Sequence, residues 1–247
     1  MALYGAGGKR WTMTERRRTA VERSADRLRI GPSALSWDGR TLTIDIDEVG
    51  APIPRRLKGQ VRLTTTALGG HVETLHAAGG HRWSPIAPAA RVEVELEKPE
   101  RSWSGVGYLD ANWGDRPLEA DFVRWDWSRA DLGNGAAAIL YDVTPRTGEG
   151  PSLGLRVAAD GTVERFVPPQ RHRLPTTGWR VIRETQSETP PRVAETLEDT
   201  PFYARSLVEG TLLGHPVRSV HESLSLDRFA STWVRVLLPF RMPRTLR

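Results

Sequence analysis

The chain has 247 residues, and its 35 Lys and Arg residues against 30 Asp and Glu residues give a formal net charge of +5 and an isoelectric point near 10.0. It contains no cysteine, which excludes disulfide bonds, thiol nucleophiles and thiolate metal sites. No apolar run approaches roughly 18 residues and no signal peptide is recognisable, so we expect a protein that is soluble or peripheral to a membrane.

The first half of the chain predicts β-strands through alternation of apolar and polar residues. Residues 28–48 indicate a β-hairpin in which every second residue from Leu42 to Ile46 is apolar and Asp38-Gly39 forms a two-residue turn. The same period recurs around Val61 and from Val92 to Leu96. Because proline lacks the amide hydrogen that a sheet ladder needs, its paired occurrence predicts two loops, at residues 51–56 and 81–88.

The second half repeats this pattern of short strands separated by turn signals, which is typical of an all-β sandwich or barrel. One short helix is expected around Asp227 to Val236, with Asp227 as its cap and Phe229 and Trp233 on one face. The predicted strands are residues 136–144, 152–160, 162–167, 179–185, 192–199, 203–212 and 216–226.

Basic residues gather at both ends of the chain. Residues 1–29 hold eight Lys and Arg against three Asp and Glu, and after Asp227 arginines alternate with apolar residues and no acid follows. Such a tail could lie on an anionic bilayer surface. The alternative is a last core segment whose arginines face water. Nucleic acid would also suit a basic protein, but the charge balance is not extreme and we expect no nucleic-acid partner.

The segment from His81 to Ala130 is rich in tryptophan and acid. Rings beside carboxyl groups can form the wall of an apolar pocket that holds a few polar groups, although the same rings could simply fill a β core. The tryptophans are Trp83, Trp103, Trp113, Trp125 and Trp127, and the acids include Asp110, Asp115, Glu119, Asp121 and Asp126.

Standard catalytic and metal-binding motifs are absent from the sequence. There is no G-x-S-x-G, H-E-x-x-H or phosphate-binding loop. His71, His76 and His81 are five residues apart, which in strands would place neighbours on opposite faces, so no metal site is predicted. A pair of acids among aromatic rings would also suit a glycosidase.

Several longer motifs carry a family resemblance. The segments HRW, GYLDANWGD, RWDWSRA, LEDTPFYARSL and HESLSLDRFAS resemble the carotenoid 1,2-hydratase family, also called hydroxyneurosporene synthases. The resemblance implies a lipocalin-like fold of two β-barrel or sandwich units, which we place at residues 1–118 and 119–247. Members of that family usually begin several dozen residues earlier, so the first unit is expected to be incomplete at its N-terminus.

The resemblance also implies a reaction. The enzyme would be a cofactor-independent hydro-lyase that adds water across the terminal C-1,2 double bond of an acyclic carotenoid, such as neurosporene or lycopene, to give a 1-hydroxy product. Protonation at C-2 leaves a tertiary carbocation for water to capture. Burial of a carboxyl in an apolar pocket favours the protonated form that such an acid needs, and aromatic faces stabilise the cation. The expected partners are the carotenoid, water and a membrane surface, with a cytoplasmic location at the inner, photosynthetic membrane.

The family's functional residues match four positions of this chain. Asp110 is expected to donate the proton, Tyr108 and Trp83 to stabilise the cation or orient the substrate, and His81 to position or deprotonate water. In an extended chain, residues i and i+2 share a face, which would pair Tyr108 with Asp110 and His81 with Trp83. Without the resemblance, His81 and Trp83 could equally be a structural clasp onto the core.

Other residues of the segment receive structural interpretations. Alternation places Trp125 and Trp127 on one face of a strand and Asp126 on the other, near Asn112 or Arg129, and Asp115 is expected in a turn. Two further functions remain open. A lipocalin-like carrier of a long apolar ligand would need the rings but no protonated acid, and a pericyclase or isomerase could use the same fold.

Overall fold

The computed structural model describes residues 1–5, 8–65 and 67–243. Most of them lie in antiparallel strands and few in helices, so the predicted all-β class is confirmed. The strands form two large sheets, and across the described residues neither sheet closes into a barrel. None of the described helices is both long enough and apolar enough to cross a bilayer.

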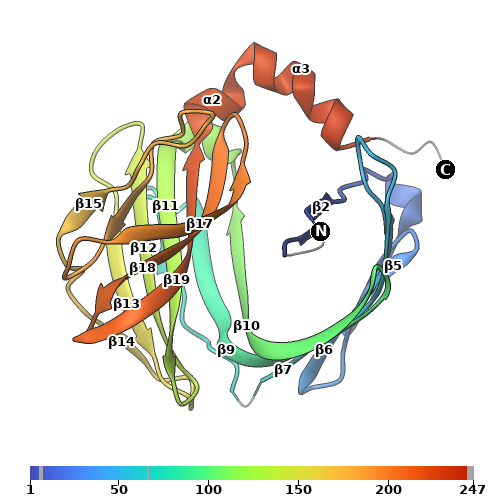
Figure 1. Ribbon diagram of the computed structural model, residues 1–247, viewed down its shortest axis with the longest axis horizontal. Coiled ribbons are helices and arrows are strands. Elements are labelled where there is room, and N and C mark those ends of the chain that lie inside the picture. Colours follow the sequence, from blue (N-terminus) through green and yellow to red (C-terminus); the bar gives the residue numbers. More distant parts are fainter. Residues whose placement is uncertain (6–7, 66, 244–247) are drawn as a thin grey trace. The chain divides into compact units, whose positions relative to one another are not determined.

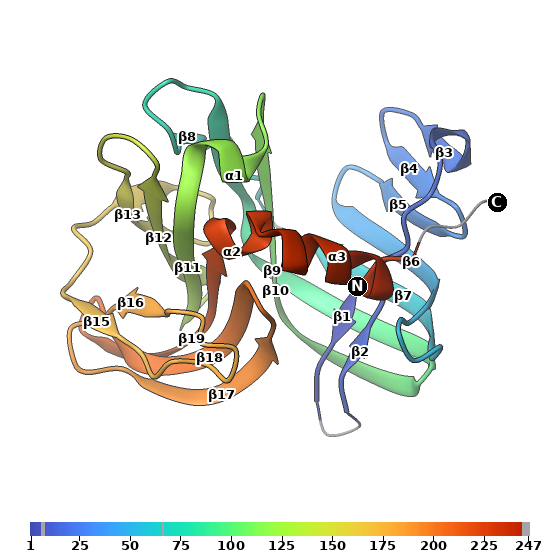
Figure 2. The same ribbon diagram turned by 90° about the horizontal axis from the view of Figure 1, so that it is seen from above.

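The first large sheet has the strand order β10-β9-β7-β6-β5-β4-β3, with β8 paired to β9; Figure 1 shows β10 to β5, and Figure 2 also labels β3, β4 and β8. A separate pair, β1 (Ala2–Leu3) and β2 (Arg10–Trp11), and a single 3-10 turn, η1 (Arg18–Ala20), accompany it. The strands of the sheet are β3 (Val21–Arg23), β4 (Arg27–Ile30), β5 (Ser33–Trp37), β6 (Thr41–Val49), β7 (Arg56–Thr64), β8 (Glu73–Thr74), β9 (His81–Lys98) and β10 (Glu100–Gly114).

The second large sheet has the order β14-β13-β12-β11-β19-β18-β17, and Figure 2 shows β15 and β16 as a small pair of strands of their own. Its members and the helices are α1 (Leu118–Asp121), β11 (Phe122–Gly133), β12 (Ala136–Pro145), β13 (Ser152–Val157), β14 (Val163–Arg165), β15 (Arg171–Arg173), β16 (Glu184–Gln186), β17 (Arg192–Asp199), β18 (Tyr203–Leu212), β19 (His215–Ser225), α2 (Leu226–Ala230) and α3 (Thr232–Arg241).

Backbone contacts divide the chain into two compact units. Unit 1 comprises residues 1–66, 90–107 and 235–247, and unit 2 comprises residues 67–89 and 108–234. Strands β9 and β10 each contribute residues to both units. The predicted division into two β units at residue 118 stays a prediction.

Each unit has a core built from alternating residues. In unit 1, Ile46, Leu57, Val94 and Leu96 pack together from β6, β7 and β9. In unit 2, the main cluster combines Trp83 with residues of β11 to β13, where Trp127 lies opposite Tyr141 and Asp126 lies opposite Asp142. Strand β11 therefore presents its rings to the core on one face and Asp126 on the other, as predicted.

Four local predictions differ from the structure. Residues 81–88, expected as a loop, begin the long strand β9. On the edge of β9 opposite β10, Pro85 and Pro88 lie between the part that pairs with β8 and the part that pairs with β7, so neither proline falls within a ladder on that edge. The hairpin predicted at residues 28–48 is formed by β5 and β6 alone, because residues 28–30 belong to the separate strand β4. Its turn is shifted by one residue from the predicted Asp38-Gly39, since the Asp38 amide donates to the Thr41 carbonyl oxygen at 3.3 Å and residues 39 and 40 lie at the tip.

The other two differences lie near the C-terminal end. Of the strand expected at residues 179–185, only Glu184 and Thr185 lie in β16. The expected helix is broken at Ser231, whose extended backbone separates α2 from α3. Ser225, not Asp227, is the residue before α2, and Asp227 instead forms an ion pair with Arg146 at 2.8 Å.

Candidate active site

Asp110 lies on β10 with two hydrogen-bond donors directed at one of its oxygens. Trp83 Nε1 donates to Asp110 Oδ2 at 2.7 Å, and Tyr108 OH donates to the same oxygen at 2.9 Å. No hydrogen bond from the described residues reaches Oδ1. Two donors on Oδ2 make that oxygen an acceptor, so any proton that the carboxyl carries belongs on Oδ1.

Aromatic rings surround this carboxyl. Trp83 has 0% exposure and meets Tyr141 edge to face, with ring centroids 5.2 Å apart. Tyr108 packs on Trp127 at 5.0 Å, and Trp125 approaches Tyr141 at 6.3 Å. The faces of large rings carry negative partial charge, so a cation formed beside Asp110 would be stabilised by them.

The two tyrosines of the site keep their protons. Burial raises the pKa of Tyr108 above its ordinary value, and the neighbouring Asp110 raises it further. Burial likewise raises the pKa of Tyr141, with a second contribution from Asp110. Both hydroxyls therefore act as donors at neutral pH, Tyr108 toward Asp110 and Tyr141 toward Asn112 Oδ1 at 3.3 Å.

His81 lies two residues before Trp83 on the same buried face of β9, but its hydrogen bond goes elsewhere. Its Nε2 lies 2.7 Å from Asp121 Oδ2, and its ring packs at 4.8 Å on that of Phe122. Burial acts to raise the pKa of Asp121, but the hydrogen bond to His81 and the charge of Arg116, 3.0 Å away, hold that pKa below its ordinary value. His81 is thus held by a carboxylate other than Asp110.

The structure therefore brings three of the four predicted residues into direct contact. Trp83, Tyr108 and Asp110 form one hydrogen-bonded cluster, whereas the hydrogen bond of His81 is to Asp121. Sequence reasoning missed Tyr141, which had been identified only as part of a strand, and the roles of Asp121 and Asn112. The sequence carried a signal for Asn112 alone: it lies two residues after Asp110 in a predicted strand, which places both side chains on the same face.

Asp126 is buried on the opposite face of β11, and its expected neighbours are wrong. It accepts hydrogen bonds from Ser223 Oγ and from the Glu184 amide at 3.3 Å, and Arg124 lies 3.7 Å away. Burial raises the pKa of Asp126 to about 6, against the lowering effect of these partners. The side chain of Arg129 instead donates to the Pro88 carbonyl oxygen. The structural role predicted for Asp126 stays a prediction.

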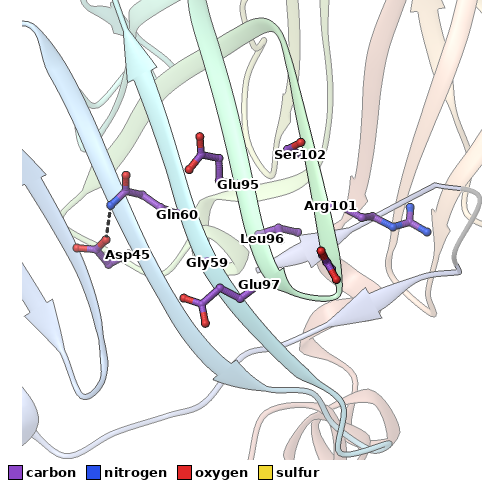
Figure 3. A pocket seen from close by; sticks show the side chains of 9 residues that line it. Asp45, Gly59, Gln60, Glu95, Leu96, Glu97, Arg101 and Ser102 are labelled. Atoms are coloured by element: carbon purple, nitrogen blue, oxygen red, sulfur yellow. Dashed lines mark hydrogen bonds between the residues drawn. The ribbon is translucent and has the colours of Figure 1, made fainter.

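A polar pocket of about 580 Å³ lies in unit 1 and is lined by other residues than this cluster of rings. Figure 3 shows carboxyl side chains around it, including Asp45, Glu95 and Glu97, and Gln60 donates to Asp45 at 2.9 Å. None of the four predicted site residues is among its lining residues. Among the described residues, no group of three or more His, Asp or Glu side chains is placed to hold a metal ion.

Comparison with known proteins supplies the family. The chain is 59% identical over 247 residues to the acyclic carotenoid 1,2-hydratase of Thiocapsa roseopersicina and 51% identical over 246 residues to that of Rubrivivax gelatinosus. Each match covers 99% of this chain and 61% of the relative, so the chain spans about three fifths of their length. The protein of the same name from Cereibacter sphaeroides is 42% identical, with 88% of its length covered. All residues from 1 to 247 also match the family described as carotenoid hydratase CrtC, and the chain belongs to that family.

Proposed function

We propose that this protein hydrates the terminal C-1,2 double bond of an acyclic carotenoid such as neurosporene or lycopene, giving a 1-hydroxy product. The observation that carries the proposal is the Asp110 carboxyl, held through one oxygen by Trp83 and Tyr108 among aromatic rings. The names of the relatives support the same substrate class.

The proposed reaction begins with Asp110 as a general acid. Its Oδ1 proton passes to C-2 of the alkene, the π electrons form the new C–H bond, and C-1 becomes a tertiary carbocation. As Asp110 becomes a carboxylate, the donors Trp83 and Tyr108 stabilise the charge on Oδ2. The aromatic rings of Tyr108 and Trp83 stabilise the carbocation at C-1.

Water then completes the addition. Its oxygen lone pair forms the C-1–O bond, the oxonium loses one proton, and the Asp110 carboxylate takes up a proton to restore the acid. We place His81 on the water side, where it positions or deprotonates the water while Asp121 occupies its Nε2. The sum is one alkene and one water giving one alcohol, and no step needs a redox partner or a cofactor.

The direct test uses Asp110→Asn, which retains the shape of the side chain but has no acidic proton. We expect turnover of lycopene in detergent micelles to fall by about two to four orders of magnitude, the usual contribution of general acid catalysis. Asp115→Asn, a change of an exposed acid in the bend that follows β10, is the matched control and should retain the parent's rate.

Isotopes distinguish the proposal from its rivals. In deuterated water the product should carry deuterium at C-2, and in water enriched in heavy oxygen it should carry the label at C-1. A carrier would bind carotenoid in both the parent and Asp110→Asn without any gain of mass, and an isomerase would change the carotenoid without adding water. Hydration by Asp110→Asn within a few-fold of the parent would remove Asp110 from the mechanism.

We also propose that the protein associates peripherally with the cytoplasmic face of a membrane, where such a substrate resides. Helix α3 exposes Trp233, Val236, Leu237 and Phe240, which share a face by their spacing, and Phe240 is 68% exposed. No acid lies within this helix, and it carries Arg235 and Arg241. An apolar stripe with arginines suits an anionic bilayer surface.

Vesicle sedimentation tests this association. The protein should pellet with anionic vesicles, less with neutral ones, and be released by high salt to the extent that the arginines contribute. Phe240→Ser should weaken pelleting, whereas Val167→Ser, at a residue 90% exposed outside the helix, should not. Equal recovery in the supernatant with and without anionic vesicles would exclude the idea.

A further inference from the structure

Asn112 shares the strand face of the proposed acid. Tyr108, Asp110 and Asn112 occupy alternate positions of β10, so their side chains project to the same side. At about 3.3 Å of rise per residue, the backbone positions of Asp110 and Asn112 are roughly 7 Å apart. In inverting glycosidases, the two carboxyl groups that leave room for a water molecule lie roughly 6.5–9.5 Å apart.

A closed set of contacts joins the two residues. Asp110 Oδ2 accepts a hydrogen bond from Trp83, the ring of Trp83 meets that of Tyr141 at 87°, and Tyr141 OH donates to Asn112 Oδ1 at 3.3 Å. Trp83 and Tyr141 are buried, with exposures of 0% and 2%. The same two rings therefore hold both the carboxyl and the amide in place.

The chemistry of the two side chains is complementary. Tyr141 keeps its proton because burial raises its pKa, so it fixes the amide with Oδ1 as the acceptor. Asn112 is exposed, whereas Asp110 is only partly so, and solvent water reaches the amide end of this row first. Oδ1 has a second lone pair that can accept a hydrogen from water and leave the water's own lone pair for bond formation.

We propose that Asn112 holds the water molecule that adds to C-1 and that Tyr141 positions Asn112 for this purpose. The proposal rests on the hydration reaction proposed above and assigns one step within it. After Asp110 has protonated C-2, the water bound to Asn112 supplies both electrons of the new C-1–O bond. The oxonium passes its excess proton to His81, whose part is thereby confined to deprotonation, and one proton returns to the Asp110 carboxylate.

The experiment separates formation of the cation from its capture. A cation that no water captures must lose a proton again, from C-2 or from a neighbouring methyl group. In deuterated water, that return leaves deuterium in carotenoid that has gained no water. Hydrated product and deuterium in unhydrated carotenoid are therefore measured side by side, by chromatography with mass detection.

We expect Asn112→Ala to lower hydration by about 10²-fold, the usual consequence of a misplaced reactant, while deuterium exchange into unhydrated carotenoid persists. Tyr141→Phe, which retains the ring and loses the hydroxyl, should shift the same ratio in the same direction by several-fold. Asp110→Asn should lose hydration and exchange together, and Asp115→Asn should lose neither.

Three outcomes would overturn the assignment, and they differ in meaning. Hydration by both Asn112→Ala and Tyr141→Phe within two-fold of the parent would refute the role of Asn112 alone. Parallel loss of hydration and exchange in Asn112→Ala would place Asn112 in the acid step or in folding. A parent protein that shows neither hydration nor exchange would refute the proposed function itself, and this inference with it.

Discussion

Tyr108→Phe tests how the donors around Asp110 contribute to proton transfer. The change removes one hydroxyl that donates to Asp110 Oδ2 at 2.9 Å and leaves the ring that packs on Trp127 at 5.0 Å. The bond becomes a hydrogen bond to a charged group only once Asp110 has given up its proton. Such bonds contribute about 1.5–3 kcal/mol, against about 0.5–1.5 kcal/mol for neutral pairs.

The expected kinetic effect follows from that change of charge. The variant loses from the barrier only the difference between the charged and the neutral bond, about 1–1.5 kcal/mol, which at about 1.4 kcal/mol for each factor of ten lowers turnover by about 5- to 10-fold. The effect should fall on kcat more than on KM, because the bond strengthens as the carboxylate forms. Trp83→Phe removes the second donor to the same oxygen, so the two losses should not add.

The assay follows hydroxylated carotenoid by chromatography, because the C-1,2 bond of the substrate is isolated and its hydration leaves the conjugated system unchanged. Rates are compared for the parent, both single variants and the double variant, with unfolding midpoints measured alongside. A Tyr108→Phe protein with kcat within two-fold of the parent would show that this hydroxyl does not stabilise the developing carboxylate. Strictly additive losses of turnover in the double variant would refute the idea that Trp83 and Tyr108 stabilise the same oxygen of Asp110.

Two further predictions concern stability. Asp126 has a folded pKa of about 6 against an ordinary 3.8, so its ionisation should lower the free energy of unfolding as pH rises from about 4 to 6, by on the order of 3 kcal/mol. Burial lowers the pKa of His221 from 6.5 to about 4, which removes stability as pH falls through that range. Urea unfolding from pH 4 to 7 should therefore show opposite slopes in Asp126→Asn and His221→Gln, and parallel slopes would contradict the assignment. Gly114→Ala places a Cβ 2.4 Å from His81 Nδ1 and should cost about 1–3 kcal/mol, whereas Gly105→Ala, where a Cβ meets nothing within 4 Å, should melt close to the parent.

Local alternation of apolar and polar residues predicted much of the fold, because alternate residues of a strand lie on the same face. The shared face of Tyr108 and Asp110, and the opposite faces of Trp127 and Asp126, needed only a period of two. The start of β9 was missed for a physical reason. The proline rule concerns a donor within a ladder, and whether Pro85 needs one depends on which strands lie beside it.

Contacts between distant segments could not be read from a single sequence. Trp83 meets Tyr141 across 58 positions of the chain, and His81 meets Asp121 across 40. Neither pair follows from periodicity, because the packing of one layer on another is decided by the whole topology. The family resemblance identified Asp110, Trp83 and Tyr108, whereas the hydrogen bonds from Trp83 and Tyr108 to one oxygen of Asp110 became visible only in three dimensions.

Because β9 and β10 are each divided between the two units, the protein cannot be separated into its units by a simple truncation or by limited proteolysis. Unit 1 is assembled from three stretches of chain, and the second of them ends at Gly107, immediately before Tyr108. A gene cut at any single point would thus separate the paired strands β9 and β10 or leave one unit without part of its chain. Shared strands also favour concerted melting over stepwise melting, so proteolytic trimming should not release either unit intact. An exchange of segments between relatives would have to transfer β9 and β10 together, and with them Trp83, Tyr108 and Asp110.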